Sequence, residues 1–127
     1  MFIRFVLLKS DPESTKKQGI LVAAHELRDE GDLTIEEHQI LREALSWFNQ
    51  HLKVPACLKR SENRRALSWF KDSAQKPLQH MWNLVYILRD HGLHVDVIKT
   101  DDPGTIIYED GWQIVAKPRR GQAKHSW

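Results

Sequence analysis

Residues 105–116 read TIIYEDGWQIVA and carry the clearest structural signal in the chain. Two runs rich in β-branched and aromatic residues flank Asp110-Gly111, a dipeptide that favours the type I′ turn of a two-residue hairpin. A loop of that length predicts three facing pairs across the hairpin: Glu109 with Trp112, Tyr108 with Gln113, and Ile107 with Ile114.

Two further segments have the pattern of strands. Residues 93–97 alternate between apolar and polar side chains, and their strand is expected to end at the turn 101–104. Residues 2–8, FIRFVLL, are apolar and too short for a helix. Arg4 is the exception in that strand and is expected at the rim of the sheet or beside an acidic partner. The aliphatic part of its side chain is expected to pack and its guanidinium group to reach solvent.

Four helices are expected between these strands. The first follows a turn at residues 10–13 and runs from Ile20 to Gly31. The second begins with a capping box formed by Thr34 and Glu37 and ends before Pro55. A short third helix is expected over residues 61–70, and a fourth, apolar on nearly every side, over residues 77–91, with Gly92 as its C-terminal cap.

This order of elements predicts an α+β fold. One domain over residues 1–117 is expected, with an N-terminal strand, four helices packed on one antiparallel or mixed sheet, and three C-terminal strands. The first strand must join the later three, because a lone strand cannot satisfy its backbone hydrogen bonds. Residues 118–127 lack apolar periodicity and are expected to form a basic, flexible tail.

Composition is typical of a soluble globular protein. The 127 residues are 41% hydrophobic and 28% charged, and five are tryptophan. Cys57 is the single cysteine, which favours a reducing cytoplasm. The apolar start is interrupted by Arg4 and does not resemble a signal peptide, and no run approaches the length that crosses a bilayer.

Charge is unevenly distributed although the net charge is only +2. Residues 13–43 contain eight acidic and four basic side chains, whereas residues 53–76 contain seven basic and two acidic ones. Such segregation of charge is evidence about the partners of a protein and not about its fold.

Motifs for catalysis, metals and cofactors are absent from the sequence. No phosphate-binding loop, dinucleotide fingerprint or serine-hydrolase elbow occurs, and the seven histidines form neither HxxxH nor HExxH. One set of residues suggests an active site: Arg4 and Tyr108, with Glu109 as a general base. The simpler interpretation is that Glu109 and Asp110 are ordinary turn residues, so the sequence favours a protein that is not an enzyme.

Binding of another macromolecule is the favoured function. Basic residues crowd the start of the expected third helix and aromatic and basic residues follow: Lys59, Arg60, Arg64, Arg65, Trp69 and Lys71, with Arg119 and Arg120 in the tail. This set suits phosphate contact and base stacking, and it suits an acidic protein equally well. Two features favour a small regulatory module with a protein partner: the segregated charge and the excess of tryptophan, a residue enriched at interface hot spots. Nucleic-acid binding is the alternative, and a small enzyme is the second alternative.

A near-repeat links two parts of the chain. REALSWF at residues 42–48 recurs as RRALSWF at residues 64–70. On a helix, Trp47 and Trp69 would each lie about 100° from the following phenylalanine, at the border of the apolar stripe. They are expected either to be half-buried or to form a shared recognition surface beside Arg64 and Arg65.

Several short motifs resemble those of a group of short uncharacterised bacterial proteins. These motifs are WFK at Trp69, MW at Met81, HG at His91, PG at Pro103 and YED followed by Gln113. The resemblance covers the chain to about Lys117. It implies a bacterial or mobile-element origin, and no activity or cofactor comes with it.

Overall fold

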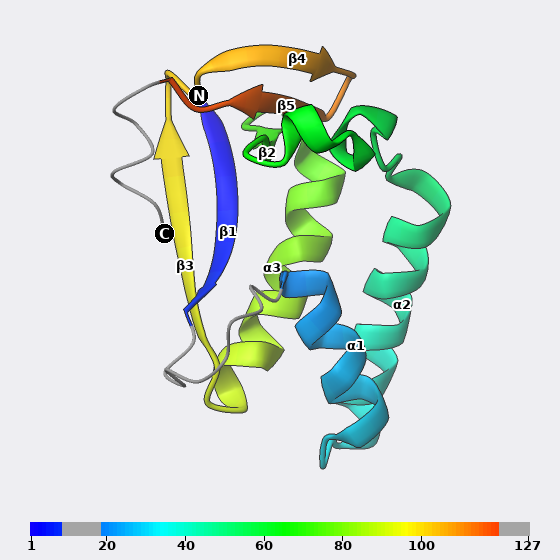
Figure 1. Cartoon of the computed structure of the whole chain (residues 1–127). Coiled ribbons are helices and arrows are strands. Elements are labelled where there is room, and N and C mark those ends of the chain that lie inside the picture. Colours follow the sequence, from blue (N-terminus) through cyan, green and yellow to red (C-terminus); the bar gives the residue numbers. More distant parts are fainter. Residues whose placement is uncertain (9–18, 120–127) are drawn as a thin grey trace. The chain divides into compact units, whose positions relative to one another are not determined.

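The protein has an α+β fold, seen in a computed structural model that describes residues 1–8 and 19–119 (Figure 1). The described residues form three α-helices, α1 Ile20–Glu30, α2 Ile35–His51 and α3 Gln75–Asp90, and two short 3-10 helices, η1 Ala56–Lys59 and η2 Ser61–Asn63. They also form five strands: β1 Phe2–Leu8, β2 Leu67–Lys71, β3 His94–Thr100, β4 Thr105–Glu109 and β5 Gln113–Lys117. The predicted class, the N-terminal strand and the three C-terminal strands are confirmed.

The five strands form one sheet in the order β3-β1-β2-β5-β4. The pairs β1–β2, β2–β5 and β4–β5 are antiparallel. The sequence left the place of β1 open, and the structure puts it inside the sheet, between β3 and β2.

The helix boundaries follow the capping signals. At the start of α2 the Thr34 hydroxyl accepts from the Glu37 amide and the Glu37 carboxylate accepts from the Thr34 amide, each at 3.1 Å. At the end of α3, Gly92 has φ +85°, its amide donates to the Arg89 carbonyl, and the Leu93 amide donates to the Leu88 carbonyl. This pair of bonds is a Schellman motif, so the predicted glycine cap is confirmed.

The expected helix over residues 61–70 is wrong. The 3-10 turn η2 occupies its first part, and residues 67–71 form strand β2, paired with β1 on one side and β5 on the other. Leu67, Trp69 and Lys71 then lie on one face of the sheet and Ser68 and Phe70 on the other. Pairing on both edges decides the conformation of this short segment, which could adopt either structure from its own composition.

The hairpin is confirmed, but its predicted turn and register are wrong. Tyr108 faces Val115 and Glu109 faces Ile114, so the loop is longer than two residues, and a bulge interrupts β4 between Ile106 and Tyr108. Gly111 does not have the positive φ that a type I′ turn needs.

The chain divides into two compact units. Among the described residues, unit 1 comprises 1–4, 53–78 and 97–119, and unit 2 comprises 5–8, 19–52 and 79–96. In unit 1, Trp69, Ile114 and Ala116 form a buried cluster against which three partly buried side chains pack: Phe2, Leu67 and Ile98. In unit 2, α1 packs against α2, and Phe5 meets Trp82 of α3 edge-to-face at 5.3 Å between ring centroids.

Charge follows this division. The described residues of unit 1 include eleven Lys and Arg and six Asp and Glu, for a net charge of +5. Those of unit 2 include three Lys and Arg and nine Asp and Glu, for a net charge of −6. The charge segregation of the sequence is therefore a property of the two folded units. Within the described residues, no helix is long and apolar enough to cross a membrane.

Candidate functional site

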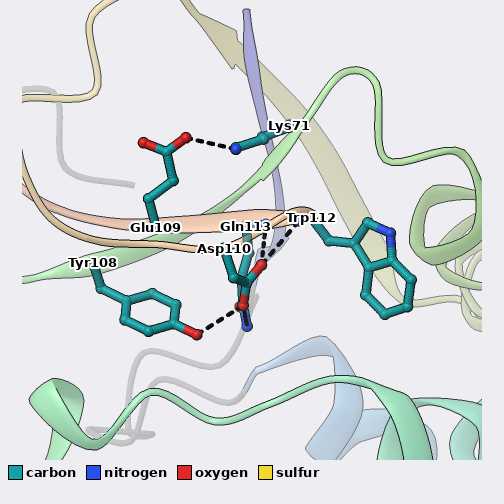
Figure 2. Close-up of polar contacts among 6 residues, drawn as sticks. All are labelled: Lys71, Tyr108, Glu109, Asp110, Trp112 and Gln113. Atoms are coloured by element: carbon teal, nitrogen blue, oxygen red, sulfur yellow. Dashed lines mark hydrogen bonds and ion pairs between the residues drawn. The ribbon is translucent and has the colours of Figure 1, made fainter.

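The hairpin loop is organised by one carboxylate. Asp110 accepts from the amides of Trp112 and Gln113 at 2.9 Å, from the Tyr108 hydroxyl at 2.8 Å and from the Gln113 side-chain amide at 3.2 Å (Figure 2). Burial acts to raise the pKa of Asp110, but these hydrogen bonds outweigh it and lower the pKa. The same hydroxyl bond raises the pKa of Tyr108. Asp110 therefore shapes the turn and is already saturated with donors.

The proposed catalytic residues do not come together. Figure 2 shows Glu109 paired with Lys71, at 2.6 Å, on one side of the β4–β5 ribbon and Tyr108 on the other side. Arg4 shares the face of Glu109, but β2 and β5 lie between their strands, which separates the two backbones by about 14 Å. Arg4, Tyr108 and Glu109 therefore do not converge on one point.

Arg4 and Trp69 have donors that lack acceptors. Arg4 donates from Nη1 to the Ser68 carbonyl at 3.1 Å, while its Nε is buried without a partner. Nε1 of Trp69 is also buried and without a partner, in a side chain that is only 4% exposed. Burial lowers the pKa of Arg4. This pair was missed as a unit, because only the pairing of β1 with β2 brings the two residues together.

Five basic residues of unit 1 lie on a fixed loop. We call residues 53–65, with η1 and η2, the basic loop. Asn63 is only 6% exposed, and its side-chain amide donates to the Cys57 carbonyl at 3.0 Å. Its own carbonyl accepts from the Ala66 amide at 2.9 Å. Asn63 therefore ties the interior of the loop, at Cys57, to its C-terminal end, a role that no sequence motif indicated.

The other end of the loop is fixed to the hairpin. The side-chain amide of Gln113, itself buried, donates to the Lys53 carbonyl at 2.6 Å. Five cationic side chains on this frame are exposed: Lys53, Lys59, Arg60, Arg64 and Arg65. Within the described residues their one ion pair is the long contact of Arg60 with Glu62, at 3.9 Å.

The remaining predicted binding residues lie elsewhere in the chain. Trp69 is buried in β2, and Lys71 is engaged by Glu109. Arg119 is paired with Asp102 at 2.5 Å, and Arg120 lies outside the described residues, as does most of the expected tail.

Trp47 lies on α2 in unit 2 and is partly buried. Its ring stacks on the His80 imidazole at 4.6 Å and lies 5.0 Å from the His51 ring. The exposed side of α2, from Ile35 to Gln50, lines an open hollow of about 710 Å³ that reaches Trp47. Because Trp47 and Trp69 occupy different structures and different burial states, the near-repeat does not form the shared surface that was considered.

Glu37 links the two longest helices of unit 2. Its second carboxylate oxygen lies 2.9 Å from Nε2 of His91, at the end of α3. The hydrogen bond from the Thr34 amide, followed by that from His91, lowers the pKa of Glu37. Within the described residues, no group of three or more His, Cys, Asp and Glu is placed to hold a metal ion.

Comparison of the chain with protein-family models, with curated proteins and with solved structures gave no match. The resemblance to short bacterial proteins stays a prediction.

Proposed function

We propose that the protein is a small binding module that docks the acidic face of a partner protein through the basic loop. The observation that carries this proposal is the set of exposed cations held on a pinned frame. Lys59, Arg64 and Arg65 form no ion pair within the described residues, so their charges are available to a partner.

Pre-organisation supports the proposal. The bonds of Asn63 and Gln113 hold the backbone that bears these cations, so little backbone entropy is lost when a partner binds. Arginine offers a planar fork of donors that matches a carboxylate, and two consecutive arginines present two such forks. A loop of this kind gives electrostatic complementarity and a fast association rate.

A protein partner is favoured over nucleic acid because of the aromatic residues. Binding of single strands combines cations with exposed rings on which bases stack. Trp69 is buried, and Lys71 is neutralised by Glu109, so the stacking half of the predicted nucleic-acid surface is missing. Nucleic acid remains the alternative, because the same cations would contact phosphates. The small enzyme has no support from the geometry of Arg4 and Glu109.

Fluorescence anisotropy of labelled poly-glutamate and of labelled single- and double-stranded oligonucleotides tests the proposal. At low salt the protein should bind poly-glutamate, and binding should weaken as salt is added. The double variant Arg64→Ala/Arg65→Ala should bind at least about tenfold more weakly. Lys76→Ala/Lys99→Ala is the matched control, since it removes two exposed cations from unit 1 outside the loop and should bind as the unmodified protein does.

The outcomes separate the partners. Oligonucleotide binding that depends on Arg64 and Arg65, without poly-glutamate binding, would establish the nucleic-acid alternative. Equal losses in the two double variants would show that only net charge matters, and no binding of any probe at low salt would remove the basic loop as a binding surface.

A further inference from the structure

Arg4 and Trp69 lie side by side on one face of the sheet. The register pairs Phe2 with Lys71 and Ile3 with Phe70, so one step further places Arg4 opposite Trp69. Directly opposite residues have Cβ atoms about 5 Å apart on the same face. Two residues that each carry a buried N–H donor without an acceptor are therefore neighbours on adjacent strands.

The described residues offer these two donors no acceptor. Glu109 lies on this face, beyond Ile114 at the far end of the same row of residues, and is bound by Lys71. Asp96 of β3 shares the face of Ile98, but it is exposed and forms no ion pair within the described residues. Arg4 forms no ion pair within the described residues and has one hydrogen bond, from Nη1. An arginine stays protonated in proteins, and a shielded charge without a counter-ion is strongly destabilising.

We propose that Arg4 and Trp69 form a binding site for one carboxylate group carried on an apolar body. Nε of Arg4 and Nε1 of Trp69 donate to the carboxylate oxygens. A single guanidinium edge and a single indole N–H supply two donors and one positive charge, which match a monoanion.

The apolar side chains around Trp69 favour a ligand whose carboxylate is attached to an apolar body. Trp69 belongs to an apolar cluster with Ile114 and Ala116, and the partly buried Phe2, Leu67 and Ile98 pack against it. These side chains offer apolar contact beside the charge. Because both donors are shielded from water, the carboxylate is buried with them when it binds, and a free inorganic phosphate, with more charge and more acceptors, is not satisfied there.

Nuclear magnetic resonance of the ¹⁵N-labelled full chain tests the site. Benzoate and hexanoate are the probes, with inorganic phosphate and chloride as comparison anions at constant ionic strength. The indole N–H resonance of Trp69, assigned by its absence in Trp69→Phe, should move downfield and saturate with benzoate or hexanoate. Phosphate and chloride should leave it in place.

Variants separate the site from general anion binding. Trp69→Phe keeps an aromatic ring but removes the donor and should weaken benzoate binding about ten- to hundredfold, the usual effect of one hydrogen bond to a charged group. Arg4→Met should abolish the shift of the Trp69 resonance. The matched control is the Arg89–Trp82 pair, in which the guanidinium lies 5.8 Å from the ring centroid and Arg89 also donates to a backbone carbonyl, that of Val95. Arg89→Met and Trp82→Phe should not change benzoate binding.

A Trp69 resonance that no carboxylate moves, or that chloride and phosphate move equally, would overturn the proposal, as would unchanged benzoate binding in Arg4→Met. If Trp69→Phe does not fold, Arg4→Lys decides the question: it keeps the charge, loses the Nε donor and should bind benzoate more weakly. The site is independent of the basic loop, so Arg64→Ala/Arg65→Ala should leave benzoate binding unchanged.

Discussion

At the scale of single residues, Asp110 shows how one carboxylate can replace a preferred turn. Asp110-Gly111 predicts a tight two-residue loop from local preference alone. The Asp110 side chain instead accepts from the two following amides, and the Asp110 amide donates to the Gln113 carbonyl at 2.9 Å. These bonds close a longer loop and shift the register of the hairpin.

The charge of Asp110 should make stability depend on pH. Its pKa is lower in the folded protein than the ordinary value of about 3.9, so its contribution is complete above that value and is lost as the pH falls through the folded pKa. Asp110→Asn keeps an acceptor but removes the charge and should cost about 1 kcal/mol at pH 6. Urea unfolding at pH 6 and pH 2.5 measures this.

Asp96→Asn serves as the control for Asp110→Asn, because Asp96 is exposed and has no hydrogen bond within the described residues. Its effect should be small at both pH values. A loss for Asp110→Asn that is as large at pH 2.5 as at pH 6 would contradict the proposed role of the charge.

Gly104, just before β4, and Gly111, in the hairpin loop, should respond differently to alanine. Gly104 has φ +110°, and a Cβ there would lie 2.1 Å from the Lys117 carbonyl oxygen, so Gly104→Ala should cost at least about 2 kcal/mol. Gly111 has ordinary φ and open space around it, so Gly111→Ala should change the free energy of unfolding by less than about 0.5 kcal/mol. A large loss for Gly111→Ala in thermal unfolding would favour the type I′ turn instead.

At the scale of elements, the segment ALSWF adopts two structures in one chain. Residues 44–48 are helical within α2, which begins with a complete capping box, and residues 66–70 run into β2, which pairs on both edges. Residues 66–70 are preceded by 3-10 turns and residues 64–65, which do not cap or begin an α-helix. The surroundings, rather than the five residues, determine the structure.

The two serines of this segment give a direct test. In α2, Ser46→Ala should be more stable than Ser46→Thr, because alanine favours helices and threonine does not. In β2, Ser68→Thr should be more stable than Ser68→Ala, because threonine favours strands. Each difference should be about 0.5 kcal/mol in urea unfolding, and the same order at both positions would contradict the assignment of β2.

These elements show what the sequence could predict. Helices α2 and α3 were predictable because Thr34, Glu37 and Gly92 mark their ends locally. Strand β2 was not predictable, because it forms by pairing with β1 and β5, which are distant from it in sequence. The proximity of Arg4 and Trp69 could not be predicted for the same reason. The cations of the basic loop were visible in the composition, whereas the role of Asn63 in fixing the loop was not.

At the scale of the whole molecule, the two units share secondary structure. The chain passes between units at residues 4/5, 52/53, 78/79 and 96/97, and three of these points lie inside β1, α3 and β3. Opposite charges on the units therefore do not imply separate domains, since each unit depends on elements that continue into the other.

Shared elements predict one cooperative unfolding transition. Loss of either unit would break β1, α3 and β3 within their lengths, so urea curves followed by circular dichroism and by tryptophan fluorescence should coincide. Trp69 and Trp112 report on unit 1 and Trp47 and Trp82 on unit 2. Separate midpoints for circular dichroism and fluorescence would contradict a single transition.

At residues 52/53 the chain passes from one unit to the other outside any helix or strand, and this has a practical consequence. A cut between Leu52 and Lys53 leaves every helix and strand whole, yet each fragment then holds part of both units. Residues 1–52 have a formal charge of −3 and residues 53–127 a charge of +5. We expect each of the two oppositely charged fragments to be unfolded alone. When they are mixed, they should recover the helical circular dichroism signal of the intact chain. Fragments that stay unfolded after mixing would show that the connection between Leu52 and Lys53 is needed for folding. The chain thus offers a natural basis for a split protein that folds only when its halves meet.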